Sequence, residues 1–149
     1  MKNSNITPFY EAQYGETRLV AFEILQKYFD QNNEEKISDI FNEILTKNAQ
    51  KNQLSLENFL EKIDDELLQQ LVVGLIDNID QIDNIILEKK YHNLEKNILR
   101  LIIFELKFLN ENSSQNIFEN YQKICRENNF KFDKNLIIEL IKNIREYEF

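Results

Sequence analysis

The chain has 149 residues, a formal net charge of −8, two glycines, one proline and one cysteine. This length suits one domain with a sizeable core, and so few glycines and prolines leave little material for the turns of a β-sheet protein. We therefore predict an all-α fold. The acidic balance argues against a broad nucleic-acid-binding face, because phosphates repel an acidic surface unless lysines and arginines gather locally.

The single cysteine, Cys125, cannot form a disulfide within the chain, and no C-x-x-C pair or His/Cys cluster is present. This pattern is typical of a reducing compartment and gives no zinc signal. We expect Cys125 to be a small core residue, and we expect no metal and no cofactor. The sequence has neither a run of roughly 18 uncharged apolar residues nor a signal-peptide pattern, which predicts a cytoplasmic protein without membrane contact.

The first part of the chain divides into an arm and two helices. Residues 1–15 include Pro8 and Gly15 and lack apolar periodicity, so we predict a flexible N-terminal arm there and a single helical domain over residues 16–149. Apolar residues then recur at helical spacing from residue 16 to 30, and again from 34 to about 49. Each stretch predicts an amphipathic helix.

Two capping residues mark the next helices. Ser55 is suited to N-cap a short helix, and Asp64 a longer one. Apolar residues continue from there to about Tyr91, which is long for one globular helix, so we expect a break near residues 78–80. Gly74 lies inside this run and predicts a close approach by another helix; the alternative is that the glycine is merely tolerated.

Residues 94–109, LEKNILRLIIFELKFL, are apolar on almost every side. A helix with this pattern must be packed all round, so we predict a central helix with Leu99 in its buried face. Charges inside such a helix need partners, because an unpaired buried charge is costly. The polar interruptions of this helix are therefore the first place to look for function: Glu95, Lys96, Asn97, Arg100, Glu105 and Lys107.

Two further helices are predicted after the central one. Ser113 or Ser114 can cap a helix that ends near the sequence ENNFKF, and Asp133 can cap the last helix. The total is about seven helices. No repeat of fixed period appears, so a solenoid is not expected.

The sequence lacks the motifs of common catalytic sites. It has no glycine-rich phosphate loop, nucleophile elbow or His-Glu metal motif, and His92 has no evident partner. We therefore predict that the protein is not an enzyme. Asp77, Asp80 and Asp83 are spaced to share a helix face, which suggests a divalent ion, but the glycine and glutamate of an EF-hand are missing and a solvated face is favoured.

One group of basic residues raises the alternative of RNA binding. Four cations lie near one helix junction, with two aromatic residues between them as candidate base-stacking platforms: Lys123, Arg126, Lys131, Lys134, Phe130 and Phe132. The favoured alternative is a solvated surface in which the two phenylalanines close the core.

Three segments, taken together, resemble the NusB family of transcription antitermination factors. The family's first-helix pattern R-x-x-A-x-x-x-L is matched by Arg18, Ala21 and Leu25. The pattern L-x-x-G-x-x-x-N-x-x-x-x-D is matched by Leu71, Gly74, Asn78 and Asp83. The longest pattern, E-x-x-V/I-L-R-I/L-x-x-Y/F-E-L, is matched in one register by Glu95, Ile98, Leu99, Arg100, Leu101, Phe104, Glu105 and Leu106.

This resemblance implies a compact all-α bundle of two packed helical subdomains without catalysis. Such proteins pair with the ribosomal protein NusE, bind boxA RNA of nascent ribosomal RNA transcripts and join the RNA polymerase antitermination complex. By the same resemblance, Arg18 is expected to bind RNA and Glu95 to contact the protein partner. Gly74, Leu99, Arg100 and Glu105 are expected to be structural.

The chain departs from the family pattern mainly in its first segment. The family carries a run of arginines there, whereas residues 13–17 contain no basic residue. RNA binding is therefore expected to be weakened or dependent on the partner. The alternatives are a NusB-fold interaction module or paralogue that has lost specific RNA binding, and the similar N-terminal domain of ribosomal RNA methyltransferases, which would require a truncated chain.

Overall fold

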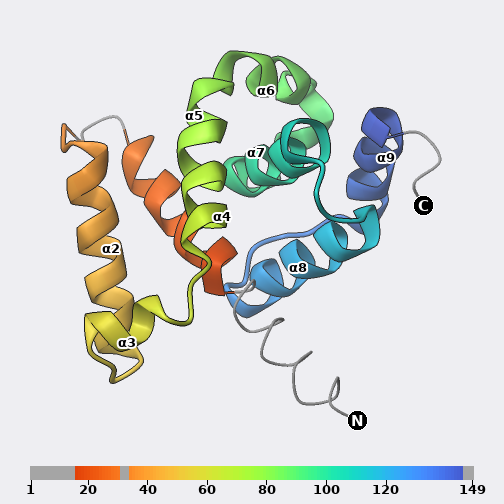
Figure 1. The fold of residues 1–149 in the computed structure, drawn as a ribbon. Coiled ribbons are helices and arrows are strands. Elements are labelled where there is room, and N and C mark those ends of the chain that lie inside the picture. Colours follow the sequence, from red (N-terminus) through yellow and green to blue (C-terminus); the bar gives the residue numbers. More distant parts are fainter. Residues whose placement is uncertain (1–15, 31–33, 146–149) are drawn as a thin grey trace, which may run out of the picture. The chain divides into compact units, whose positions relative to one another are not determined.

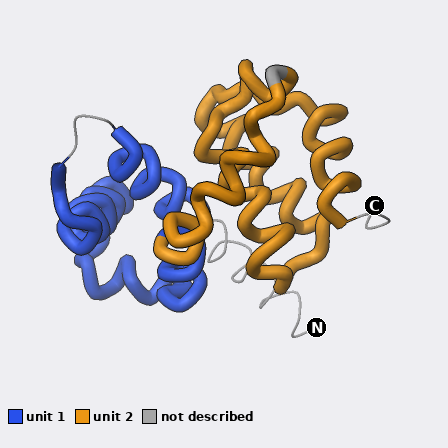
Figure 2. Tube along the Cα trace, turned by 90° about the horizontal axis from the view of Figure 1, so that it is seen from above, with its two compact units in different colours: residues 1–72 blue, residues 73–149 orange. Residues whose placement is uncertain are grey.

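The structure is a computed structural model that describes residues 16–30 and 34–145. Every regular element in these two ranges is a helix (Figure 1), which confirms the predicted all-α class. The predicted N-terminal arm lies outside the described residues. The chain divides into two compact units, residues 1–72 and 73–149, coloured separately in Figure 2. The prediction of one domain over residues 16–149 stays a prediction.

The first unit contains the helix of residues 16–28, α2 (Ile37–Lys51), α3 (Leu56–Leu60) and α4 (Asp65–Gln69). Both predicted caps are confirmed, since Ser55 accepts a hydrogen bond from the backbone N–H of Asn58 and Asp64 from that of Leu67. The backbone N–H of Asp64 also donates to Thr17 Oγ1 over 3.0 Å. The start of α4 is therefore tied to the helix of residues 16–28.

A π-helix, η1 (Gln70–Gly74), leads into the second unit, which begins with α5 (Leu75–Asp77) and α6 (Ile79–Ile86). The predicted break is confirmed at Asn78, which has φ −114° and ψ 19° and separates α5 from α6. Its side chain donates to the Gly74 carbonyl over 2.8 Å. With α4, η1 and α5 counted as one continuous helix, the described residues contain eight helices, close to the about seven predicted.

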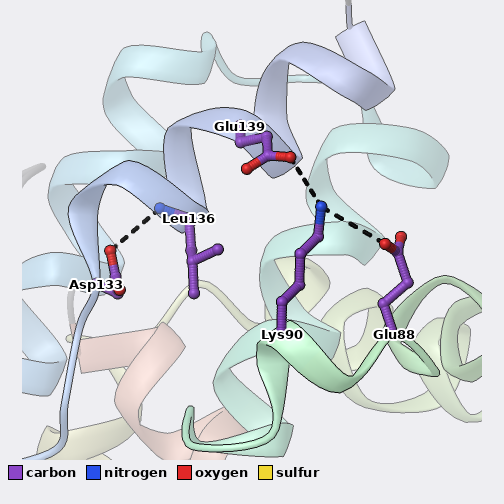
Figure 3. Close-up of polar contacts among 5 residues, drawn as sticks. All are labelled: Glu88, Lys90, Asp133, Leu136 and Glu139. Atoms are coloured by element: carbon purple, nitrogen blue, oxygen red, sulfur yellow. Dashed lines mark hydrogen bonds and ion pairs between the residues drawn. The ribbon is translucent and has the colours of Figure 1, made fainter.

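The rest of the second unit follows a short 3-10 turn, η2 (Lys89–Tyr91). The central helix α7 (Lys96–Phe104) continues into a π-helical segment, η3 (Glu105–Leu109), and α8 (Ser114–Glu127) and α9 (Lys134–Arg145) complete the unit. Ser113 caps α8, and Asp133 accepts the backbone N–H of Leu136 over 3.2 Å at the start of α9 (Figure 3). Of the two serines predicted as caps, Ser113 is the one used.

Within the second unit, α7 is the central element that its composition predicts. Eight of its nine residues, Asn97 to Phe104, are buried, and Leu99 is 1% exposed. α7 contacts α5, α6 and α8. A helix that is apolar on almost all sides is stable in water only when neighbours cover it in this way.

At Gly74 the backbone and α7 approach each other closely. A Cβ atom built on Gly74 would lie 2.7 Å from Cζ of Phe104, a separation that real Cβ atoms essentially never show. The Phe104 ring is 4% exposed and stacks on Phe108 with ring centroids 5.9 Å apart, so it has little freedom to withdraw. A side chain at this position would therefore meet the Phe104 ring of α7.

Candidate functional site

Arg100 braces α6 against α7 within the second unit. Its Nε and Nη2 atoms donate to the two carboxylate oxygens of Asp83, each over 2.9 Å, and Nη1 donates to Asn97 Oδ1 over 2.8 Å. The Arg100 residue is 7% exposed. A two-pronged arginine–carboxylate pair of this kind fixes both position and direction. Arg100 therefore links α6 to α7 through these hydrogen bonds.

Glu105 joins the central helix to α8. Its carboxylate accepts a hydrogen bond from the Tyr121 hydroxyl at 2.5 Å and one from Asn112 Nδ2 at 3.3 Å. Glu105 is 1% exposed and Tyr121 is fully buried. Because a buried carboxylate is costly without hydrogen-bond donors, these two donors explain how a glutamate is accommodated inside the bundle.

Arg145 completes the same region, and sequence analysis missed it. Its guanidinium donates to the backbone carbonyls of Glu105, Leu106 and Asn112 over 3.2, 3.1 and 2.7 Å. The first two carbonyls belong to η3, at a helix end where carbonyls commonly lack helical partners, although the Glu105 carbonyl also accepts the backbone N–H of Asn110 over 2.9 Å. An arginine in the last turn of a helix is usually assigned to that helix's own dipole, so nothing in the sequence links Arg145 to residues 105–112.

The two residues predicted to make functional contacts lie in different units and different environments. Arg18 is 1% exposed, so in this conformation its guanidinium is not presented to a phosphate. Glu95 is half-buried at the N-cap position of α7, and its side chain makes no capping hydrogen bond. The RNA contact of Arg18 and the partner contact of Glu95 stay predictions.

Cys125 is a core residue, as predicted. It is 1% exposed, and burial, reinforced by the charge of Glu95, raises the pKa of its thiol to about 11. Because the thiolate is the reactive form, the thiol is inert near neutral pH.

The acidic residues predicted to share a helix face do not act as a set. Asp83 pairs with Arg100, whereas Asp77 and Asp80 are exposed. In residues 16–30 and 34–145, no group of three His, Cys, Asp or Glu side chains is arranged to hold a metal ion. In the same ranges no helix combines the length and the apolar character needed to span a membrane.

His92 lines a pocket of about 280 Å³ between the end of α6 and the start of α7, together with Tyr91 and Leu94. Lys90 beside it bridges η2 to α9 by an ion pair with Glu139 of 2.8 Å (Figure 3). The Glu139 carboxylate is the main cause of the raised pKa of Lys90. The turn that carries Tyr91 and His92 is thus anchored to α9.

The residues around the α8–α9 junction divide into packing and surface groups. The Phe132 ring packs edge-to-face on Phe118, which is 8% exposed, with centroids 5.3 Å apart. Phe132 therefore contributes to packing rather than offering a free stacking platform, as the favoured alternative predicts. The four cations of the same segment are all exposed: Lys123, Arg126, Lys131 and Lys134.

These features define a class of protein. It is an all-helical bundle in which the charged residues of the sequence motifs hold neighbouring helices together. A model of the NusB family matches residues 15–137, from just before the helix of residues 16–28 into α9. The chain belongs to the NusB family. This is a non-enzymatic family of RNA-binding factors of transcription antitermination. Comparison with curated proteins gives no match, and neither does comparison with solved structures.

Proposed function

We propose that this protein is a transcription antitermination factor that pairs with the ribosomal protein NusE and binds boxA RNA of nascent ribosomal RNA transcripts. The observation that carries the proposal is the family match over residues 15–137, since it covers all three segments in which the sequence resembles the NusB pattern. The protein acts in the cytoplasm as part of the RNA polymerase antitermination complex.

Glu95 is the proposed contact with NusE. Its carboxylate stands at the start of α7, where it is half-buried and does not cap the helix. Arg100, five residues later, is held by Asp83 and Asn97, so the start of α7 is fixed from within the unit. A carboxylate on so rigid a support is well placed to meet a cation of a partner, because little conformational freedom is lost on binding.

RNA binding is proposed to depend on the complex with NusE. Arg18 is the sole basic residue of the segment in which the family carries several arginines, and it is 1% exposed. Each lost phosphate contact removes part of the salt-dependent affinity. The same observation favours a second candidate function, a protein-interaction module of the NusB fold that has lost specific RNA binding.

One titration separates the two functions. Fluorescent boxA RNA is titrated with the protein alone and with its NusE complex, beside a scrambled RNA of equal length. The first function predicts that the complex binds boxA more tightly than the scrambled RNA, and that the protein alone binds weakly. A complex that forms but shows no preference for boxA would establish the second function instead.

Two variants in the same experiment test the partner contact. Glu95→Gln is expected to weaken association with NusE by roughly tenfold, as for loss of one interfacial charge contact. The matched control is Glu111→Gln, an exposed glutamate between η3 and α8, which should leave the affinity unchanged. Equal affinities of the two variants would remove Glu95 from the interface.

A further inference from the structure

The exposed cations at the α8–α9 junction form a basic segment of the second unit. Between residues 122 and 135 the only carboxylates are Glu127 and Asp133, and Asp133 is engaged at the cap of α9. The cations, called here the junction cations, are Lys123, Arg126, Lys131 and Lys134. They stand out because the whole chain has a net charge of −8.

The junction cations are not committed to the fold. Within the described part of the chain, none of the four forms an ion pair with a carboxylate, whereas Lys27, Lys90 and Arg100 all do. A surface cation without an intramolecular partner keeps its full attraction for an anionic ligand. These four charges are therefore available for binding.

The backbone holds these charges in fixed places. Lys123 and Arg126 lie one turn apart on the face of α8 opposite its buried residues. The helix ends in a left-handed residue, Asn129 with φ 60°, and the backbone N–H of Phe130 donates to the Cys125 carbonyl over 2.8 Å. This closing arrangement is typical of a well-ordered helix end.

The second pair of cations follows directly from that turn. Lys131 lies between that turn and Phe132, whose ring packs on Phe118. Lys134 is the first residue of α9. A turn that is hydrogen-bonded at one end and packed at the other presents its lysines in a defined arrangement. The four charges thus follow one another from the end of α8, through the turn, to the start of α9.

We propose that the junction cations are the principal phosphate-contacting surface for RNA, in place of the arginine run that this chain lacks. The proposal rests on the proposed function above. Its argument is charge complementarity: a nucleic-acid backbone repels most of an acidic protein and is attracted where unpaired cations gather. These cations contact the RNA backbone rather than its bases, so they supply affinity and the preference for boxA comes from elsewhere.

The test measures how RNA affinity depends on salt, using the complex of the full chain with NusE. The four junction cations are replaced together by glutamine. Each phosphate contact to single-stranded RNA contributes about 0.7 to the slope of log affinity against log salt concentration. The slope of the variant is expected to fall by roughly two to three units, equally for boxA and scrambled RNA.

A matched control removes the same number of charges elsewhere. It replaces four exposed lysines of the first unit by glutamine: Lys36, Lys47, Lys51 and Lys62. The control should keep the wild-type slope, because a change in overall charge does not remove phosphate contacts. The triple variant Lys123→Arg, Lys131→Arg and Lys134→Arg should also keep the wild-type slope, because it retains the three charges. If the fourfold variant fails to fold, Lys131→Gln with Lys134→Gln should lower the slope by about half as much.

The outcomes distinguish this inference from the function on which it rests. If the wild-type complex binds RNA and the junction variant keeps its slope, the junction is not the RNA surface. The same conclusion follows if the junction and control variants lose equal amounts of RNA affinity. It also follows if the junction variant loses the ability to bind NusE but not the ability to bind RNA. If the wild-type complex binds neither boxA RNA nor the scrambled RNA, the proposed function fails together with this inference.

Discussion

Replacing Leu99 by alanine is expected to lower the free energy of unfolding by about 2–5 kcal/mol. Leu99 is 1% exposed in the middle of α7, and every residue from Asn97 to Phe104 around it is buried. Hydrogen bonds of Arg100 and Glu105 link the surrounding helices, so we expect these helices to relax only partly into the space left by the side chain. Chemical denaturation followed by circular dichroism measures the loss.

The matched control is Leu87→Ala. Leu87 belongs to the same unit but is 75% exposed, so its truncation should change the stability by less than about 0.5 kcal/mol. A loss below about 1 kcal/mol at Leu99 would mean that α7 is not the centre of its unit, because a fully buried leucine in a tight core costs more than that.

Replacing Tyr121 by phenylalanine is expected to lower the stability by about 1.5–3 kcal/mol, the range for a hydrogen bond to a charged group. The substitution removes one oxygen and leaves the ring in place. It deprives the buried Glu105 carboxylate of a donor at 2.5 Å, in a site that water does not reach. The same denaturation experiment measures the effect.

Tyr28→Phe serves as the control for that substitution. Tyr28 is half-buried and packs edge-to-face on Phe29 with ring centroids 5.1 Å apart, a contact that does not need the hydroxyl. The loss of stability caused by Tyr28→Phe should therefore stay below about 0.5 kcal/mol. Equal losses of stability for the two tyrosine substitutions would contradict a structural role for Glu105 as the acceptor of the Tyr121 hydroxyl.

Much of the fold could be predicted from local patterns. The apolar character of residues 94–109 identified the central helix, and Ser55, Asp64 and Asp133 marked helix starts, because capping depends on residues only a few positions apart. The break at Asn78 was also visible, as an interruption in a run too long for one helix. The π-helical segments η1 and η3 were not predicted, since their hydrogen-bond pattern leaves no simple trace in residue spacing.

The roles of individual charges were harder to predict, because they depend on contacts between distant positions. Arg100 and Glu105 were expected to support packing, but their partners Asp83 and Tyr121 lie 17 and 16 residues away. Arg145 donates to carbonyls 33 to 40 residues away. No spacing rule connects such positions.

For the functional residues, sequence and structure give different kinds of information. The resemblance assigns RNA contact to Arg18, whereas the structure leaves this side chain 1% exposed. The junction cations drew attention in the sequence only as a basic group with two phenylalanines. In three dimensions these cations form no ion pair with any carboxylate of residues 16–30 and 34–145, and Phe132 packs on Phe118.

The most direct test of the central claim is a transcription assay in which RNA polymerase meets a terminator downstream of boxA. We predict that this protein, added together with NusE, raises read-through on the boxA template and leaves a template with scrambled boxA unchanged. No rise on either template, or an equal rise on both, would contradict a role as a boxA-dependent antitermination factor.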